Sequence, residues 1–325
     1  MEWRFVANYI RARLLGTRNR YRKWEMSDSA SQPQVRAMRS LLYVPGDQPA
    51  MIVKALDRGA DGLIFDLEDA VRSDKKAFAR EAVGNWLAKN DNPASAVWVR
   101  VNAGSDLMDA DLQAVVQRGL TGLYVPKVSA PEDVEKVATQ LDDLEQAAGI
   151  TEGTVRIAAL LETADGILDA RSIAGSPRMS HLSVGEADLA AELGMHPSPD
   201  GHEMVPIRTS IVVASASAHL NAPIGPVLTA LNDPTMLEAT SLDLFRLGYG
   251  GRTAVHPAQI PVINAAFSPT KRDVERAEEI IGRFDQAASD GNAVTVDADG
   301  ALIDEAIVRR ARRTIVTHER STHGH

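Results

Sequence analysis

The sequence predicts a (β/α)8 barrel, an α/β fold, followed by a C-terminal helical extension. The 325-residue chain is long for one average domain and fits a barrel of about 250 residues with extensions at both ends. Short apolar runs alternate with amphipathic, charged stretches along most of it. Strands that are apolar almost throughout are typical of parallel sheets that helices cover.

Eight apolar runs predict the strands, at residues 40–45, 62–67, 96–102, 122–127, 156–162, 181–186, 222–226 and 251–257. Helical spacing predicts helices at 48–59, 73–89, 106–118, 131–148, 164–174, 205–220 and 233–247. The first run ends in VPGDQP, which does not fit the G-x-G-x-x-G turn of a doubly wound dinucleotide-binding sheet. A barrel is therefore the better prediction.

We expect three parts: a basic, disordered extension at 1–38, a catalytic barrel at 39–270 and a helical extension at 271–325. Residues 1–25 have a net charge of +5 in a chain of −9, which leaves −14 for the rest. An apolar stripe at Trp3, Val6, Ile10 and Leu14 keeps a membrane-surface or targeting helix, or loose nucleic-acid contact, as alternatives. The polar segment 26–40 is typical of an ordinary chain start, so we expect neither a nucleic-acid nor a membrane partner.

The composition excludes several kinds of chemistry. Cysteine is absent, so disulfides, thiolate nucleophiles and cysteine-bound zinc are excluded. No apolar run reaches the roughly 20 residues of a membrane span. We expect a cytoplasmic protein whose metal, if it has one, is bound by oxygen or imidazole ligands.

Charged residues follow the predicted strands, and the carboxyl ends of barrel strands converge on one mouth. These strand-end residues include Asp66, Glu68, Asp69, Arg100, Lys127, Glu162, Glu186, Asp188 and His256. Several carboxylates in one mouth repel one another unless a divalent cation lies among them, and oxygen ligands without thiols favour Mg²⁺. Glu162 and Asp188, at adjacent strand ends, suit that role. Each could instead cap a helix.

Eight motifs in order resemble the citrate lyase beta-subunit-like family of CoA-ester lyases, within the HpcH/HpaI aldolase superfamily. They cover about 39–313 and read RSLLYVPGDQP, GLIFDLEDAV, VWVRVN, LYVPKVSAPEDV, ALLETADGILDARSIAG, LSVGEADLAAELG, GYGGRTAVHPAQIPVINAAFSP and GALIDEAIVRRAR. The resemblance implies a magnesium-dependent (β/α)8 barrel, commonly a homotrimer, that cleaves or forms a carbon–carbon bond in a 3-hydroxyacyl-CoA such as malyl-CoA or citramalyl-CoA. The products of cleavage are an acyl-CoA and a 2-oxo acid.

By this resemblance, Glu162 and Asp188 hold Mg²⁺, and Glu162 also contributes to substrate binding. Arg100 faces a substrate carboxylate or an enolate oxygen as a catalytic and binding residue. Without the resemblance, Arg100 could simply form a salt bridge with Asp66 or Glu68. Glu68 and Asp69 are expected to orient Arg100 or metal-bound water, and a role at a helix N-terminus is an equal alternative for Asp69.

The resemblance assigns the catalytic acid or base to Asp304, in a C-terminal segment that reaches into the mouth of a neighbouring subunit. Read alone, Asp304 would be the N-cap of a helix. Glu305 and Ala306 follow it, where the family usually has a proline shortly after the aspartate.

The CoA thioester is assigned to Tyr43, Lys54 and the backbone of Ala254 and Val255. His256 is expected to be a structural residue. Three other activities stay open: condensation as in malate synthase, thioester hydrolysis, and binding of a CoA thioester without turnover.

Overall fold

The computed structural model describes residues 38–322 and confirms the predicted barrel. Eight parallel strands close in sequence order, with β8 paired to β1. The strands are β1 (Ser40–Pro45), β2 (Gly62–Asp66), β3 (Ala96–Arg100), β4 (Gly122–Val125), β5 (Arg156–Leu161), β6 (Met179–Val184), β7 (Ile224–Gly225) and β8 (Gly251–Ala254). Each of the eight strands overlaps one of the predicted apolar runs. The runs are apolar because a strand in a covered parallel sheet is buried on both of its faces.

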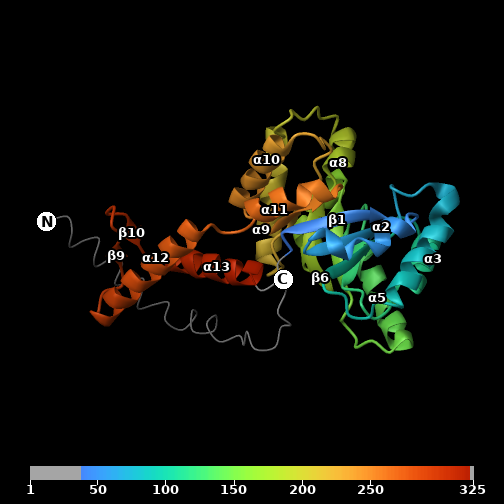
Figure 1. Ribbon diagram of the computed structural model, residues 1–325, viewed down its shortest axis with the longest axis horizontal. Coiled ribbons are helices and arrows are strands. Elements are labelled where there is room, and N and C mark those ends of the chain that lie inside the picture. Colours follow the sequence, from blue (N-terminus) through green and yellow to red (C-terminus); the bar gives the residue numbers. More distant parts are fainter. Residues whose placement is uncertain (1–37, 323–325) are drawn as a thin grey trace. The chain divides into compact units, whose positions relative to one another are not determined.

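Helices and 3₁₀ turns cover the outside of the barrel (Figure 1). They are α2 (Pro49–Val53), η1 (Leu56–Arg58), η2 (Ser73–Lys75), α3 (Lys76–Leu87), α4 (Ser105–Val115), α5 (Pro131–Ala148), α6 (Ala164–Leu168), α7 (Ala170–Ala174), α8 (Glu186–Leu193), η3 (His202–Met204), α9 (Val205–Ser217), α10 (Pro234–Leu247), η4 (Pro257–Gln259) and α11 (Ile260–Ala266).

Side chains alternate between two cores along each strand. On β1, Leu41 and Tyr43 point to the barrel interior, while Leu42 and Val44 join the larger core between strands and helices. The interior core contains Leu41, Ile64, Trp98, Tyr124, Ala158 and Ile224. Side chains therefore fill the interior of the barrel, so a ligand could bind only at an end of it, and in this fold sites lie at the carboxyl ends of the strands.

Two predicted strands run past the observed strand into the helix that follows it. The predicted strand at 181–186 ends at Val184, and Glu186 begins α8, a helix that the sequence analysis did not predict. The strand predicted at 251–257 ends at Ala254, because Pro257 opens η4 and His256 caps it. Asp188 consequently lies in the first turn of a helix and not at a strand end.

The C-terminal extension contains α12 (Lys271–Ser289) and α13 (Glu305–Thr322), which pack against each other (Figure 1). A two-stranded antiparallel sheet of β9 (Thr295–Val296) and β10 (Leu302–Ile303) connects them. The predicted N-terminal extension lies almost wholly outside the described residues. Among residues 38–322, no helix is long and apolar enough to span a membrane.

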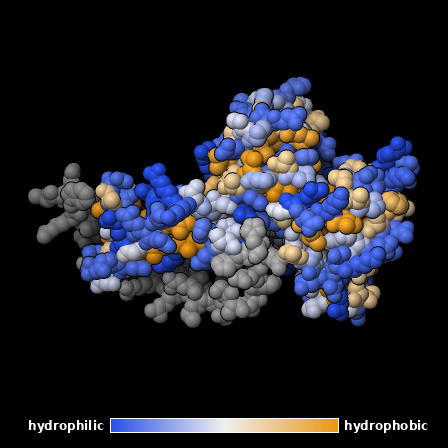
Figure 2. All heavy atoms as spheres, viewed as in Figure 1, coloured by the Kyte–Doolittle hydropathy of each residue, from blue (hydrophilic) through white to orange (hydrophobic). Residues whose placement is uncertain are grey.

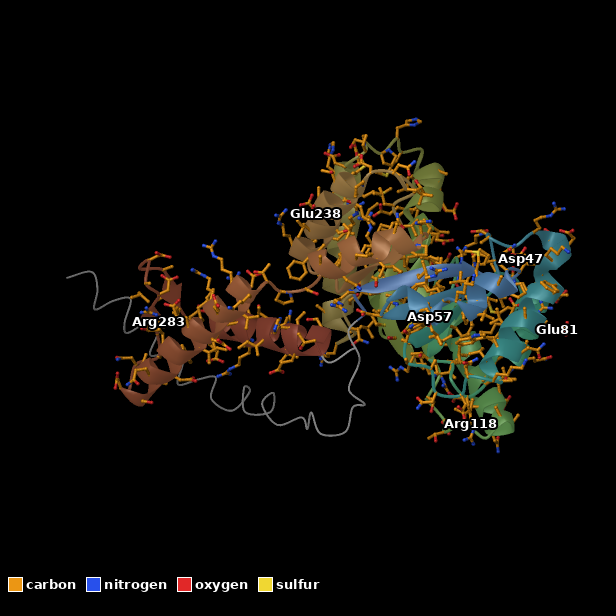
Figure 3. All side chains as sticks on the ribbon, in the orientation of Figure 1. Asp47, Asp57, Glu81, Arg118, Glu238 and Arg283 are labelled. Atoms are coloured by element: carbon orange, nitrogen blue, oxygen red, sulfur yellow. The ribbon has the colours of Figure 1, made fainter. Side chains whose placement is uncertain are left out.

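Charged side chains occupy the periphery of the barrel, as Asp47, Glu81 and Arg118 illustrate in Figure 3. The visible surface is mostly hydrophilic, with apolar atoms gathered over the α10–α11 region (Figure 2). Against this background, ionisable groups buried at the strand ends are exceptional and call for a chemical explanation.

Candidate active site

Glu162 directly follows β5 and is a buried carboxylate with an unpaired oxygen. The residue is 4 % exposed, and its Oε2 has no hydrogen-bond partner among the described residues. Burial, with the nearby charges of Glu68 and Asp188, raises the pKa of Glu162 to about 8. A buried carboxylate in this state is costly unless a proton or a cation compensates it.

Asp188 lies in the first turn of α8, directly after β6. It is exposed, and its carboxylate makes no hydrogen bond or ion pair within residues 38–322. Four residues later, Glu192 Oε1 accepts a hydrogen bond of 2.9 Å from Ala164 N. Since residues i and i+4 share a helix face, the face of α8 that carries Asp188 is turned toward the segment after Glu162. This places both carboxylates at the same part of the barrel mouth.

Gly185, between β6 and α8, provides the space for the Glu162 carboxylate. A Cβ added at Gly185 would lie 2.6 Å from Glu162 Oε1 and 2.5 Å from its Cγ. The backbone N–H of Gly185 donates to Leu161 O over 3.0 Å, which fixes this close approach. Any larger residue would displace the carboxylate from its observed position.

Arg100, at the end of β3, is bound by Asp66, the last residue of β2, and by Glu68, two residues later. Its Nε and Nη2 donate to the two Asp66 oxygens over 2.8 and 2.5 Å, and Nη1 lies 3.1 Å from Glu68 Oε2. The guanidinium also lies over the Tyr43 ring, 5.1 Å from its centroid. The alternative prediction, a salt bridge of Arg100 with Asp66 or Glu68, is therefore confirmed for both acids. Tyr43, Arg100 and Glu68 form one layer of the mouth.

Glu68 is the second perturbed acid of the mouth. Burial raises its pKa to about 7, although Arg100 counteracts this effect. Lys127 Nζ lies 3.8 Å from Glu68 Oε1, and Lys127 has a left-handed backbone with φ of 56°. Strained residues and shifted carboxylates concentrate at functional sites. The perturbed groups thus identify the same mouth that the strand-end argument predicted.

Apart from Tyr43, the residues predicted to bind the CoA thioester, and His256, form no hydrogen bond or ion pair with Glu162, Glu68 or Arg100 within residues 38–322. Lys54 is exposed at the end of α2, and Ala254 is fully buried at the end of β8. The N–H of Val255 donates to Gln259 Oε1 at 2.9 Å, whereas its carbonyl has no hydrogen-bond partner within residues 38–322. His256 caps η4 through its Nδ1, which accepts from Ala258 N over 3.2 Å.

Asp304 is the N-cap of α13: its Oδ1 accepts a hydrogen bond of 3.0 Å from Ile307 N. This is the structural role that its position before a helix predicts. The cap uses one carboxylate oxygen only. The cap therefore leaves a second oxygen for other chemistry.

Arg208 of α9 is a mouth residue that the strand-end pattern does not predict, and its guanidinium binds both oxygens of Glu186 at 2.6 and 2.7 Å. Its signal was present, since Arg208 is the only charged residue in α9 and is buried. A lone charge within an apolar helix indicates a buried partner.

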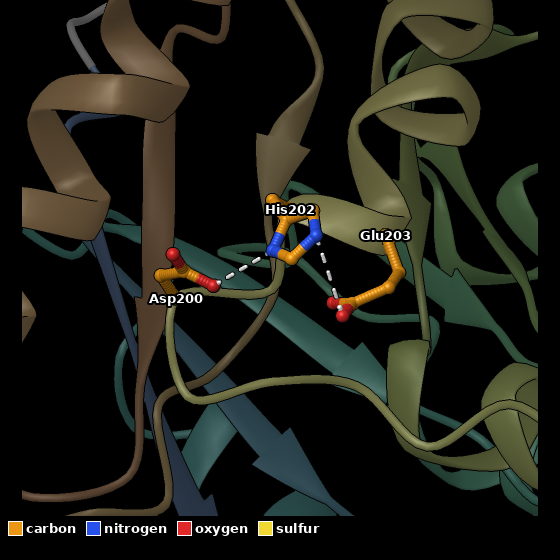
Figure 4. Close-up of side chains that lie close together, drawn as sticks. All are labelled: Asp200, His202 and Glu203. Carbon is orange, nitrogen blue, oxygen red and sulfur yellow. Dashed lines mark hydrogen bonds and ion pairs between the residues drawn. The ribbon is translucent and has the colours of Figure 1, made fainter.

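A second group of potential ligands, Asp200, His202 and Glu203, lies between α8 and α9 (Figure 4). His202 Nδ1 is 3.2 Å from Asp200 Oδ1, and its Nε2 is 3.6 Å from Glu203 Oε1. Asp200 and His202 are exposed, and Ser198 also binds Asp200 and Glu203. These mutual contacts explain the group without a metal.

Comparison with known proteins agrees with this architecture. The chain is 34% identical over 287 residues to a (3S)-malyl-CoA thioesterase of Cereibacter sphaeroides, covering 88% of this chain and 96% of that protein. It is 31% identical over 282 residues to a citrate lyase subunit beta of Leuconostoc mesenteroides, covering 86% and 93%.

Among solved structures, CitE of Mycobacterium tuberculosis with magnesium, acetoacetate and coenzyme A has a TM-score of 0.70 at 23% identity, covering 87% of this chain and 98% of that one. A further CitE structure with magnesium and acetoacetate has a TM-score of 0.61 at 27% identity, covering 72% and 92%. The family model described as HpcH/HpaI aldolase/citrate lyase matches residues 39–257. With this match over the whole barrel, the chain belongs to the HpcH/HpaI aldolase/citrate lyase family.

Proposed function

We propose that the protein is a magnesium-dependent carbon–carbon lyase acting on a 3-hydroxyacyl-CoA such as malyl-CoA or citramalyl-CoA. The observation that carries this proposal is the buried, unpaired Glu162 carboxylate beside Asp188. The relatives support this substrate class, because they include a malyl-CoA thioesterase and a CitE protein crystallised with magnesium and acetoacetate. We propose a cytoplasmic homotrimer as the working form.

The donor set fits Mg²⁺, a hard cation that takes oxygen ligands and usually only one or two protein carboxylates. Glu162 and Asp188 would hold it, and the orphaned Oε2 of Glu162 is the atom that most needs a cation. When bound, Mg²⁺ would supply Lewis-acid polarisation and chelation of the oxygen atoms of the acid half of the substrate.

Arg100 would orient the substrate. Asp66 holds its Nε and Nη2 edge, so the Nη1 corner, shared with Glu68 and the exposed Asp69, is the part that a substrate oxygen can reach. A guanidinium fixed in this way costs little reorganisation when it binds a carboxylate or an enolate oxygen.

Cleavage breaks the bond between the α and β carbons of the 3-hydroxyacyl-CoA. The hydroxyl loses its proton and becomes the keto group of the 2-oxo acid, and the bonding electrons pass to the acyl-CoA as an enolate. The enolate carbon then takes a proton. We propose that Asp304 of a neighbouring subunit gives this proton, and that it removes the proton in the condensation direction.

The CoA thioester would lie along Tyr43, Lys54 and the β8 end. Tyr43 is half-buried against Arg100, Lys54 is an exposed cation, and Val255 has an exposed side chain and a free carbonyl. A phosphate-bearing ligand suits such an exposed lysine, whereas the buried Ala254 can contribute only through its backbone.

Thioester hydrolysis is the second candidate, since the malyl-CoA thioesterase is 34% identical over 88% of this chain. Incubation with malyl-CoA or citramalyl-CoA and Mg²⁺, followed by mass spectrometry, separates the possibilities. Lysis gives glyoxylate or pyruvate with an acyl-CoA, and hydrolysis gives free CoA with the intact hydroxy diacid. Condensation as in malate synthase appears only when acetyl-CoA and glyoxylate are supplied and ends in malate and free CoA.

The metal assignment is tested by E162A and D188A, each of which should abolish Mg²⁺-stimulated turnover. Full activity in both variants would refute the metal site. Tight binding of a CoA thioester in calorimetry, with no turnover under any divalent cation, would instead indicate a binding subunit without catalysis.

A further inference from the structure

We infer that the buried ion pair between Glu186 and Arg208 positions Asp188 for metal binding. The inference rests on the proposed metal site at Glu162 and Asp188. It concerns a pair of residues that would not touch the metal or the substrate. Their role would be to hold the first turn of α8, from which Asp188 projects.

The pair has the geometry of a strong anchor. Glu186 Oε1 accepts from Arg208 Nε over 2.6 Å and Oε2 accepts from Nη2 over 2.7 Å, so both carboxylate oxygens are used. The side chains of Arg208 and Glu186 are only 10 % and 18 % exposed. Tyr249 Oη donates to Arg208 O over 3.4 Å, which links the anchor to the residues after α10. Two parallel charge-assisted hydrogen bonds fix orientation as well as distance.

Asp188 itself has no such support. It is exposed, and its carboxylate makes no hydrogen bond or ion pair within the described part of the chain. Its position therefore follows from the placement of α8. The helix is held at its first residue by Arg208 and near its other end by Glu192, which accepts from Ala164 N over 2.9 Å. Asp188 lies between the two anchors.

A magnesium ligand needs this precision. Mg²⁺ demands near-octahedral geometry with bonds of about 2.0–2.1 Å, so a ligand on a helix that can shift by a fraction of an ångström binds weakly. Residues that orient metal ligands typically change metal affinity by about 10- to 100-fold when they are replaced. The Glu186–Arg208 pair is placed to have such an effect.

The sign of the effect separates positioning from simple electrostatics. Arg208 carries its positive charge beside Glu186, two residues from Asp188, so its charge alone opposes cation binding there. If Arg208 acted only through its field, R208M would tighten metal binding. If it positions α8, R208M weakens metal binding despite the loss of a repelling charge.

The experiment measures the affinity of the full chain for Mn²⁺, used as a paramagnetic substitute for Mg²⁺, from the free-ion signal in electron paramagnetic resonance. The variants are R208M, R208K and E186Q. The matched control is R178M, because Arg178 pairs with buried Glu145 at the opposite end of β6. Melting temperatures of all variants are recorded alongside.

We expect R208M to lower Mn²⁺ affinity at least tenfold, with R208K and E186Q intermediate, since each keeps part of the pair. R178M should lower the melting temperature and leave Mn²⁺ affinity within twofold of wild type. If R208M does not fold, R208K carries the same expectation, because it keeps the positive charge and loses the two-point contact with Glu186. E186Q alone does not, because loss of an acid weakens cation binding through its field as well.

Unchanged or tighter Mn²⁺ binding in the folded Arg208 and Glu186 variants, or equal weakening in R178M, would overturn the inference. The proposed function has a separate control in the same titration: wild type binds Mn²⁺ and D188A does not. If wild type fails to bind, the metal site falls and the positioning role falls with it. If wild type binds, D188A does not and R208M binds normally, only the positioning role is lost.

Discussion

The carboxylate of Glu162 occupies the place where a side chain at Gly185 would begin. A Cβ at Gly185 would lie between 2.5 and 2.8 Å from three atoms of Glu162. Glu162 follows β5 and Gly185 follows β6, so two adjacent strand ends approach this closely only because one carries no side chain. The glycine of the GEAD segment is thus a part of the acidic site.

We predict that G185A displaces Glu162 and lowers Mn²⁺ affinity and Mg²⁺-dependent turnover by at least tenfold. The carboxylate is the flexible end of a side chain, so it can rotate away and the fold should survive. Titration with Mn²⁺ and a thermal melt check the two parts of this expectation. G282A in α12 is the control, because a Cβ there meets nothing within 4 Å. A G185A variant that binds metal like wild type would show that Glu162 is not a ligand.

The substitution D304N separates the helix-capping role of Asp304 from its proposed role in proton transfer. Asparagine caps helices about as well as aspartate, so D304N should keep the bond to Ile307 N and melt within about 1 °C of wild type. D304A should lose the cap and about 1 kcal/mol of stability. If Asp304 transfers the proton, D304N should still lose lyase turnover by at least about 100-fold, as the loss of a general acid does. Steady-state assays at saturating substrate measure it, and wild-type turnover in D304N would leave only the capping role.

The proposal that neighbouring subunits share sites predicts complementation. We expect D304N and E162Q to be inactive alone and to regain turnover when they are unfolded and refolded together. Some mixed mouths would then combine an intact Glu162 with an intact Asp304 from the neighbour. Mixing E162Q with D188N is the control, because both lesions lie in one mouth and mixing cannot repair them. No recovery with D304N would show that each subunit's own Asp304 serves its own mouth.

His181 predicts acid lability of the barrel. It is fully buried, with Nε2 2.8 Å from Tyr124 Oη, and burial lowers its pKa to about 3. The unfolded chain takes up the proton near pH 6.5, whereas the folded chain resists it. Stability from this site is therefore complete above pH 6.5 and falls by about 1.4 kcal/mol per unit as the pH drops toward 3.

The comparison of wild type with H181N isolates this contribution. H181N should be less stable than wild type at pH 7, because Tyr124 loses its hydrogen bond to His181. The difference in unfolding free energy between the two proteins should decrease from pH 6 to pH 4.5, because only wild type loses stability through His181. Urea unfolding at several pH values measures it. If the difference in unfolding free energy does not change with pH, the folded barrel takes up a proton on His181 as readily as the unfolded chain does.

Much of the fold follows from patterns that act over a few residues. Continuous apolar runs such as SLLYVP predicted the strands, because a strand buried on both faces must be apolar throughout. The same pattern gave the wrong end for the strand at HLSVGE, because β6 ends at Val184 and the following acid, Glu186, already begins α8. The strand-end prediction for Asp188 was therefore wrong in its element, because Asp188 lies in the first turn of α8, the helix that follows β6.

The sequence by itself determined the barrel and the set of acids at its mouth, since local periodicity sets the strands and parallel strands bring their ends together. Only the tertiary structure decided which acid is neutralised and which is not. Asp66 is also buried, but Arg100 from the next strand binds both of its oxygens, whereas Glu162 Oε2 has no partner in the described part of the chain. Charge pairing depends on distances of a few ångströms between residues that lie tens of positions apart in the chain, and no local pattern encodes those distances.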